Sequence, residues 1–210
     1  MANYKKLKIK AYNIIKQKIL NNELQPGEYL EEKMLCEMLD VSRTPIREAI
    51  SLLENENLVQ IIPNKGIFVT TFTIQSVKEL FQARHLMEPM ALQLSFKNLN
   101  IDILVDFKKK FSDGIEKKDY PLLHELDYKF HNYLNSKCNN AYLVRYLKNI
   151  SDNFQRVRTM SFYTVERTEA GAQEHIQLIE LIIEEDLHGS IEFLERHISN
   201  TEKYYFKSLL

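Results

Sequence analysis

The sequence has few of the residues that loops, sheets and disulfide-bonded folds need. Its 210 residues include five Gly, five Pro, two Cys and no Trp. Four of the five Pro precede residue 90, so the rest of the chain has few residues that interrupt helices. Cys36 and Cys138 are far apart and lack a CxxC spacing, which indicates two reduced thiols rather than a disulfide framework.

Long apolar runs and an excess of one charge are also missing. No apolar run approaches the length of a membrane span, and the polar start MANYKKLKIK differs from a signal peptide, so we expect a cytoplasmic protein. The 28 Lys and Arg nearly balance the 29 Asp and Glu, for a net charge of −1. This balance excludes a protein coated in positive charge for nucleic acid. A DNA-binding surface would have to come from local placement of cations.

The first seventy residues show the pattern of three helices and a hairpin. An apolar ladder over residues 4–20 predicts a helix, Pro26-Gly27 interrupts it, and EEKMLCEML predicts a short second helix. The third helix lies in VSRTPIREAISLLENEN, with Ser42 as a plausible N-cap and Pro45 in the first turn. LVQII and GIFVTTF then predict a β-hairpin. This element order is that of a winged helix-turn-helix, whose second core helix enters the DNA major groove.

Three cations fall where such a domain would contact DNA. Arg43 and Arg47 are one turn apart on the third helix, outside its apolar stripe, and Lys65 lies at the hairpin tip. Taken alone, any of them is ordinary solvated surface, and the basic run Lys5–Lys10 is weak evidence. Their joint placement in this element order favours DNA binding.

The stretch LQPGEYLEEKMLCEMLDVSRTPIREAISLLENENLVQIIPNKGIFV closely resembles the DNA-binding domain of the GntR family of bacterial transcription regulators. The resemblance covers residues 4–72. Asp40 and Asn57 occupy places where the family usually has Gly, and both types tolerate a left-handed backbone, so the turns should survive. The DNA contacts that the resemblance implies are Lys33, Ser42, Arg43, Thr44, Arg47, Lys65 and Gly66.

The second half has a purely helical pattern. Breaks at LNID, KKDYP, CNN, YTVER and DLHGS separate six predicted helices, at about 74–97, 101–117, 120–137, 140–163, 167–185 and 187–208. The fold class is therefore mainly α, with a winged helix-turn-helix at residues 1–72 and a six-helix bundle at 73–210. Bundles of this size commonly hold ligand and metal sites in their cores.

Titratable side chains lie on apolar faces of these helices. Of the six His, three fall on inward faces, and Asp127 lies one turn before the first of them, His131. The other two are His175 and His197. A single His of this kind is usually a core residue bonded to one carbonyl. Three with a carboxylate form a donor set that suits zinc, nickel, iron or manganese.

This half resembles the all-helical FCD effector domain of the FadR subfamily of GntR regulators. The resemblance covers about residues 75–205 and rests on VKELFQARHLMEPMAL, on DYKFHNYL followed by NNAYL, and on the spacing of the last two His. With six helices, this half is similar to the VanR-like branch of the subfamily. In metal-binding members the ligands are one Asp and three His, which map to Asp127, His131, His175 and His197. Zinc is the first expectation, with nickel or manganese next.

The function implied is a ligand-responsive DNA-binding regulator, most simply a repressor and a homodimer on a palindromic operator. A small organic acid would fill open positions on the metal, and Arg84 would face the cavity and receive its carboxylate. The alternative for Arg84 is a surface ion pair with Glu88, one turn later.

Two other functions use the same residues. The metal ion itself would be the signal in a direct metal sensor. A metalloenzyme would use the ion to activate water, but it needs a positioned acid or base, and the sequence has no HExxH motif. Glu174 precedes His175 and is expected to point to another face. We therefore expect no enzyme.

Overall fold

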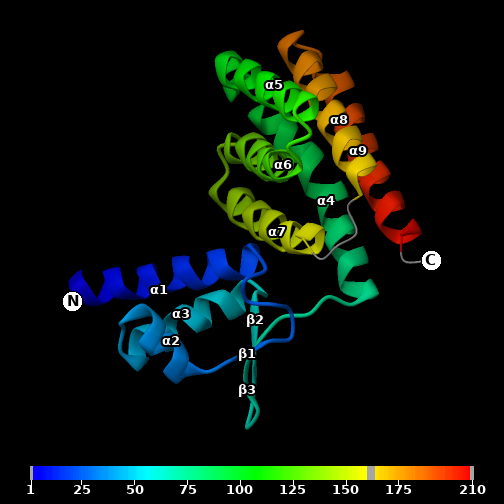
Figure 1. The fold of residues 1–210 in the computed structure, drawn as a ribbon. Coiled ribbons are helices and arrows are strands. Elements are labelled where there is room, and N and C mark those ends of the chain that lie inside the picture. Colours follow the sequence, from blue (N-terminus) through cyan, green and yellow to red (C-terminus); the bar gives the residue numbers. More distant parts are fainter. Residues whose placement is uncertain (1, 160–163, 209–210) are drawn as a thin grey trace. The chain divides into compact units, whose positions relative to one another are not determined.

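A computed structural model of the chain describes residues 2–159 and 164–208 (Figure 1). These residues form two compact units, one built from the amino-terminal helices and strands and one from most of the later helices. No described helix has both the length and the apolar character that crossing a bilayer requires.

The first unit combines helices with a three-stranded antiparallel sheet. Its elements are α1 (Ala2–Leu20), β1 (Tyr29–Leu30), α2 (Glu32–Leu39), α3 (Arg43–Asn55), β2 (Val59–Ile62) and β3 (Gly66–Val69). The sheet order is β1-β3-β2, with Gln60 opposite Phe68 in the hairpin. The predicted helices and hairpin are confirmed, and β1 is an additional strand that the sequence did not indicate.

Helix α3 is the centre of this unit. Its apolar stripe, which includes Ile46, Ile50 and Leu53, is buried in the core that also receives the inward side of α1. The opposite side of α3 faces solvent. Ser42 takes the N-cap position as predicted, although its side chain makes no capping hydrogen bond. Asp40 adopts the left-handed backbone that the missing glycine would have supplied, at φ 52°.

The second unit is all-helical apart from one short 3₁₀ turn. Its elements are α4 (Ile74–Ser95), η1 (Phe96–Asn98), α5 (Ile101–Glu116), α6 (Tyr120–Ser136), α7 (Ala141–Thr159), α8 (Val165–Ile183) and α9 (Leu187–Lys207). The six predicted helices are confirmed within a few residues at their ends. The predicted extension of the fourth helix to residue 163 lies outside the described residues.

Helix α8 organises this bundle. It packs against α5, α6 and α9, so one helix has three neighbours around its circumference (Figure 1). Large apolar side chains, among them Phe111 of α5 and Phe130 of α6, fill the space between them. Because α8 is surrounded, neighbouring positions along it face different helices. This arrangement determines where its polar side chains point.

Candidate metal centre and nucleic-acid interface

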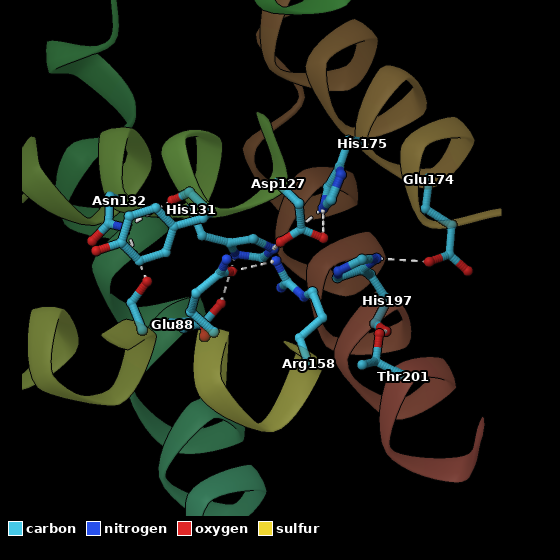
Figure 2. Close-up of polar contacts among 12 residues, drawn as sticks. Glu88, Asp127, His131, Asn132, Arg158, Glu174, His175, His197 and Thr201 are labelled. Atoms are coloured by element: carbon cyan, nitrogen blue, oxygen red, sulfur yellow. Dashed lines mark hydrogen bonds and ion pairs between the residues drawn. The ribbon is translucent and has the colours of Figure 1, made fainter. Parts of the chain in front are cut away.

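Three buried histidines meet in the core of the helical unit. His131 lies on α6, His175 on α8 and His197 on α9, and none is more than 5% exposed. Figure 2 shows the three rings directed toward one another. Each offers one nitrogen to a group whose atoms all lie within 4.8 Å of one another. The sequence predicted this meeting of three inward faces.

The local sequence explains why each ring points inward. On α6, His131 continues a stripe of Leu123, Phe130 and Leu134, all of them buried. The rings of His175 and His197 occupy buried stripes of α8 and α9 in the same way. A helix must bury its apolar stripe, so the imidazoles within the stripes are carried into the core.

Asp127 lies beside two of these rings. Its Oδ1 is 3.8 Å from Nε2 of His131, and its Oδ2 is 3.8 Å from Nε2 of His175. The two residues Asp127 and His131 are one turn apart on α6, as the DYKFH spacing predicted. The carboxylate therefore adds a third donor group beside the two facing imidazoles.

A carboxylate accepts a hydrogen bond from the outer nitrogen of two of the rings. His131 Nδ1 lies 3.0 Å from Glu88 Oε2, and His197 Nδ1 lies 2.7 Å from Glu174 Oε2. An ionised carboxylate can only accept, so Nδ1 is the protonated nitrogen in both rings. In a neutral ring, the lone pair is then on Nε2.

Both carboxylates are held in the charged form. Burial alone would raise the pKa of Glu88, but the charge of Arg84 and the hydrogen bonds from His131 and Arg84 lower it well below its ordinary value. Burial likewise opposes hydrogen bonds from His197 and Arg167 at Glu174, and those bonds lower the pKa of Glu174. Burial also lowers the pKa of His197, which favours a neutral ring with a free lone pair.

His175 is supported by aromatic side chains. Its ring centroid lies 5.0 Å from that of Phe111 and 5.2 Å from that of Phe130. Its Nε2 stands 3.2 Å from Nε2 of His131. These contacts place the ring between an apolar wall and the other donor groups.

The donor set fits a transition-metal ion. Nitrogens bound to one ion at about 2.0–2.1 Å stand about 2.8–3.4 Å apart for bond angles of about 90–110°. The separation of 3.2 Å between the Nε2 atoms of His131 and His175 falls in this range. Imidazole and carboxylate are ligands that zinc, nickel and manganese accept.

A small pocket opens from the histidines. It is lined by residues of α6, α8 and α9, namely Leu123, His124, Asp127, Arg167, Thr168, Gly171, Ala172, His175, His197 and Thr201. Its free volume is about 10 Å³, which is room for about one water molecule or one ion. An organic acid does not fit without movement of the lining side chains.

Two expectations for polar residues are corrected by the structure. Glu174 was expected to point away from the site, but its carboxylate binds His197, because α8 presents this face to α9. Arg84 does not line the pocket. Its guanidinium donates to Glu88 at 2.6 Å and lies 3.9 Å from the centroid of the Phe154 ring. The ion pair with Glu88 that the alternative expected is therefore present, but at 2% and 5% exposure it lies in the core and not on the surface. The arginine in the pocket wall is Arg167.

The residues expected to contact DNA lie on the surface of the first unit. Ser42, Arg43, Thr44 and Arg47 are all exposed at the start of α3, and Lys65 is exposed at the hairpin tip. Lys33 of α2, Arg43 and Arg47 line a groove together with Gly66 of β3. Lys33, Arg43 and Arg47 therefore share one face, formed by the helix-turn-helix and the hairpin.

Arg47 has a partner that the sequence did not indicate. Its Nε lies 2.9 Å and 3.0 Å from the two carboxylate oxygens of Glu32 on α2. The Arg47 side chain is 65% exposed, and exposed pairs contribute only about 0–1 kcal/mol. Glu32 therefore orients the guanidinium but holds it only weakly.

Both units match known protein families. Residues 7–69 match the bacterial regulatory proteins of the gntR family, and residues 79–200 match the FCD domain. A helix-turn-helix with an FCD domain defines a DNA-binding transcription regulator rather than an enzyme. The chain belongs to the GntR family of bacterial transcription regulators and contains its FCD domain.

Individual relatives agree with this assignment. The chain is 26% identical over 202 residues to the HTH-type transcriptional repressor GlaR of Escherichia coli K12, covering 90% of each protein. The fold matches a GntR regulator from Rhodococcus sp. RHA1 with a TM-score of 0.83 at 18% identity, covering 95% of this chain and 97% of that one. The metal-free FCD domain of TM0439 matches with a TM-score of 0.59 at 25% identity, covering 66% of this chain and 97% of that one.

Proposed function

We propose that this regulator binds its operator through residues 1–72 and responds to a small organic acid through a metal-containing effector domain at residues 73–210. The observation that carries the proposal is the convergence of His131, His175 and His197 in a buried core, with Asp127 beside them. A carboxylate and three imidazoles are ligands that a divalent transition-metal ion accepts. The ion would supply Lewis acidity toward a carboxylate ligand.

The ion would be held by one oxygen of Asp127 and one nitrogen from each of the three histidines. Zinc is the first expectation, and nickel or manganese the next, since these donors do not select sharply among them. Four protein ligands leave further positions open in metals that take five or six. A small organic acid would use those positions.

We assign the second contact of the acid to Arg167 rather than Arg84. Arg167 lies in the pocket wall, where its Nη2 also approaches Thr201 Oγ1 at 3.3 Å. A guanidinium fork is suited to a carboxylate. Arg84 is not among the residues that line this pocket.

DNA recognition is assigned to the exposed face of the first unit. Arg43 and Arg47 would read base edges or phosphates from α3, and Lys65 and Gly66 would bring the hairpin to the backbone. The other contacts assigned to this face are Lys33, Ser42 and Thr44. We further propose a homodimer on a palindromic operator, because paired recognition helices match paired half-sites. A repressor is proposed because the relative GlaR is one.

A direct test uses purified protein and DNA selected from a random duplex library. We expect the wild type to enrich a two-half-site sequence that the Arg43→Ala variant does not. Zinc-loaded protein should then release this DNA when a panel of acids (acetate, succinate, malate, citrate) is titrated at constant ionic strength. A panel in which no acid changes the affinity, with zinc bound, would refute the effector proposal.

The small pocket favours one second candidate, a direct metal sensor. A free volume of about 10 Å³ suits an ion better than an organic acid. In that case zinc alone would change operator affinity, and acids would add nothing. Gel-shift titrations with zinc alone and with each acid separate the two candidates.

A further inference from the structure

Two similar series of hydrogen-bonded side chains, called chains below, support the histidines. In the first, Arg84 Nε donates to Glu88 Oε1 at 2.6 Å, and Glu88 Oε2 accepts from His131 Nδ1 at 3.0 Å. The second runs from Arg167 through Glu174 to His197. Figure 2 shows its last contact, between Glu174 and His197. Each chain links a guanidinium, a carboxylate and an imidazole. The two chains use different helices, so they are independent features of the fold.

The imidazole end of each chain determines which nitrogen can bind a metal. A neutral imidazole has one protonated nitrogen and one lone pair, and its surroundings select the tautomer. A carboxylate at Nδ1 requires the proton there and leaves the lone pair on Nε2. In His131 it is Nε2 that faces Nε2 of His175 at 3.2 Å. The selected tautomer therefore directs a lone pair toward the point where the rings converge.

The guanidinium end holds the carboxylate in place. Arg84 and Arg167 each donate directly to the carboxylate of their own chain. The carboxylate then presents an oxygen to the ring nitrogen. Arg84 thus acts through Glu88.

We propose that Glu88 and Glu174 are positioning residues of the metal centre, which fix His131 and His197 in the tautomer that offers Nε2 to the ion. The inference rests on the proposed metal binding, and it adds two residues that do not touch the ion. Outer partners of this kind change metal affinity by about 10–100-fold when they are removed.

The structure offers a matched control. His85 Nε2 and Glu202 Oε2 lie 3.0 Å apart, which is another histidine–carboxylate contact in the same unit. His85 does not belong to the group that converges in the core. Removing the Glu202 carboxylate therefore changes a similar contact without changing the proposed donor set.

The experiment measures zinc affinity by competition with a fluorescent chelator for the wild type and for Glu174→Ala, Glu174→Gln and Glu202→Ala. Glu174→Ala should bind zinc about 10–100-fold more weakly. Glu174→Gln, which keeps an oxygen acceptor for Nδ1, should lie in between. Glu202→Ala should match the wild type. Thermal melts without metal confirm that each variant is folded.

A second readout is the ¹⁵N NMR spectrum of the imidazoles in metal-free protein. The wild type should show His197 with a protonated Nδ1, and Glu174→Ala should show a mixture of tautomers. Glu88→Gln gives the same test at His131, with its own melt as a folding control. Unchanged zinc affinity and unchanged tautomers in folded Glu174→Ala would overturn the inference. A wild type that binds no zinc would instead overturn the proposed metal centre, whatever the tautomers.

Discussion

Zinc should stabilise the folded chain by an amount that can be estimated in advance. The proposed ligands come from α6, α8 and α9, and His131 and His175 are 44 residues apart in the sequence. Only the folded chain brings them together, so zinc binds the native state and not the unfolded one. At a free zinc concentration of about 100 times Kd, mass action contributes about 2.7 kcal/mol.

This free energy corresponds to a measurable shift in melting temperature. A chain of about 150–250 residues gains roughly 2–4 °C in Tm per kcal/mol. We therefore expect zinc to raise the Tm of the wild type by about 5–11 °C. Differential scanning calorimetry on chelator-treated protein, with zinc buffered at several free concentrations, measures the shift and its dependence on the logarithm of concentration.

Variants assign the shift to the site. In His175→Ala and Asp127→Ala the zinc-dependent shift should be small or absent, each measured against the metal-free form of the same variant. His188→Ala is the control, because the His188 side chain is 85% exposed and lies outside the core group. A wild-type Tm that ignores zinc, nickel and manganese would refute the reasoning. So would an equal loss of the shift in His188→Ala.

Three further outcomes follow from the first unit. Arg43→Ala with Arg47→Ala should abolish specific operator binding while leaving the melting curve unchanged, since each Arg on a base is worth about 1–3 kcal/mol of discrimination; undiminished affinity in gel shifts would contradict it. Lys65→Ala should weaken binding to all duplexes and reduce the slope of log affinity against log salt by about one, measured by fluorescence anisotropy. Gly66→Ala should lower the free energy of unfolding by about 1–3 kcal/mol, because Gly66 has φ 113°, a backbone conformation that residues with a side chain rarely adopt. Much of this cost should persist in a Tyr29→Ala background, which removes the ring 2.4 Å from the added Cβ, and chemical denaturation measures both.

The helices could be predicted from the sequence because their causes are local. Apolar periodicity and scarce Gly and Pro specify each helix within its own segment, and turn residues mark the ends. Strand β1 could not be found this way. Tyr29 and Leu30 are too few for a period-two pattern, and they form a strand only by pairing with Phe68 and Ile67 of β3. The pairing partner lies nearly forty residues later.

The centre of the site was predictable and its surroundings were not. Asp127 and the three histidines lie within apolar stripes, so periodicity alone directs them inward. Glu174 interrupts no stripe, and adjacent positions on a helix face directions about 100° apart. Glu174 reaches His197 only because α8 packs against α9 as well as against α6. Which neighbours surround a helix is a property of the whole bundle.

The position of Arg84 also could not be predicted from its local sequence. The sequence placed Arg84 and Glu88 one turn apart, which describes an ion pair equally well on a surface or in a core. Burial decides between them, and at 2% exposure the Arg84 side chain is fully committed to partners inside the bundle. An arginine that receives a ligand needs donors directed into a pocket, and in this unit Arg167 lies in the pocket wall.

The small size of that pocket has a consequence for the proposed response. A ligand shifts a conformational equilibrium only by as much as it binds one conformation more tightly than the other. With about 10 Å³ free, an organic acid can enter only if side chains of α6, α8 or α9 move. Its binding must then favour an altered packing of these helices, and the free energy of its contacts with the ion and Arg167 drives that change. In the proposed acid response, entry of the acid and rearrangement of the bundle would therefore be one event, whereas a metal ion alone would fit without such a rearrangement.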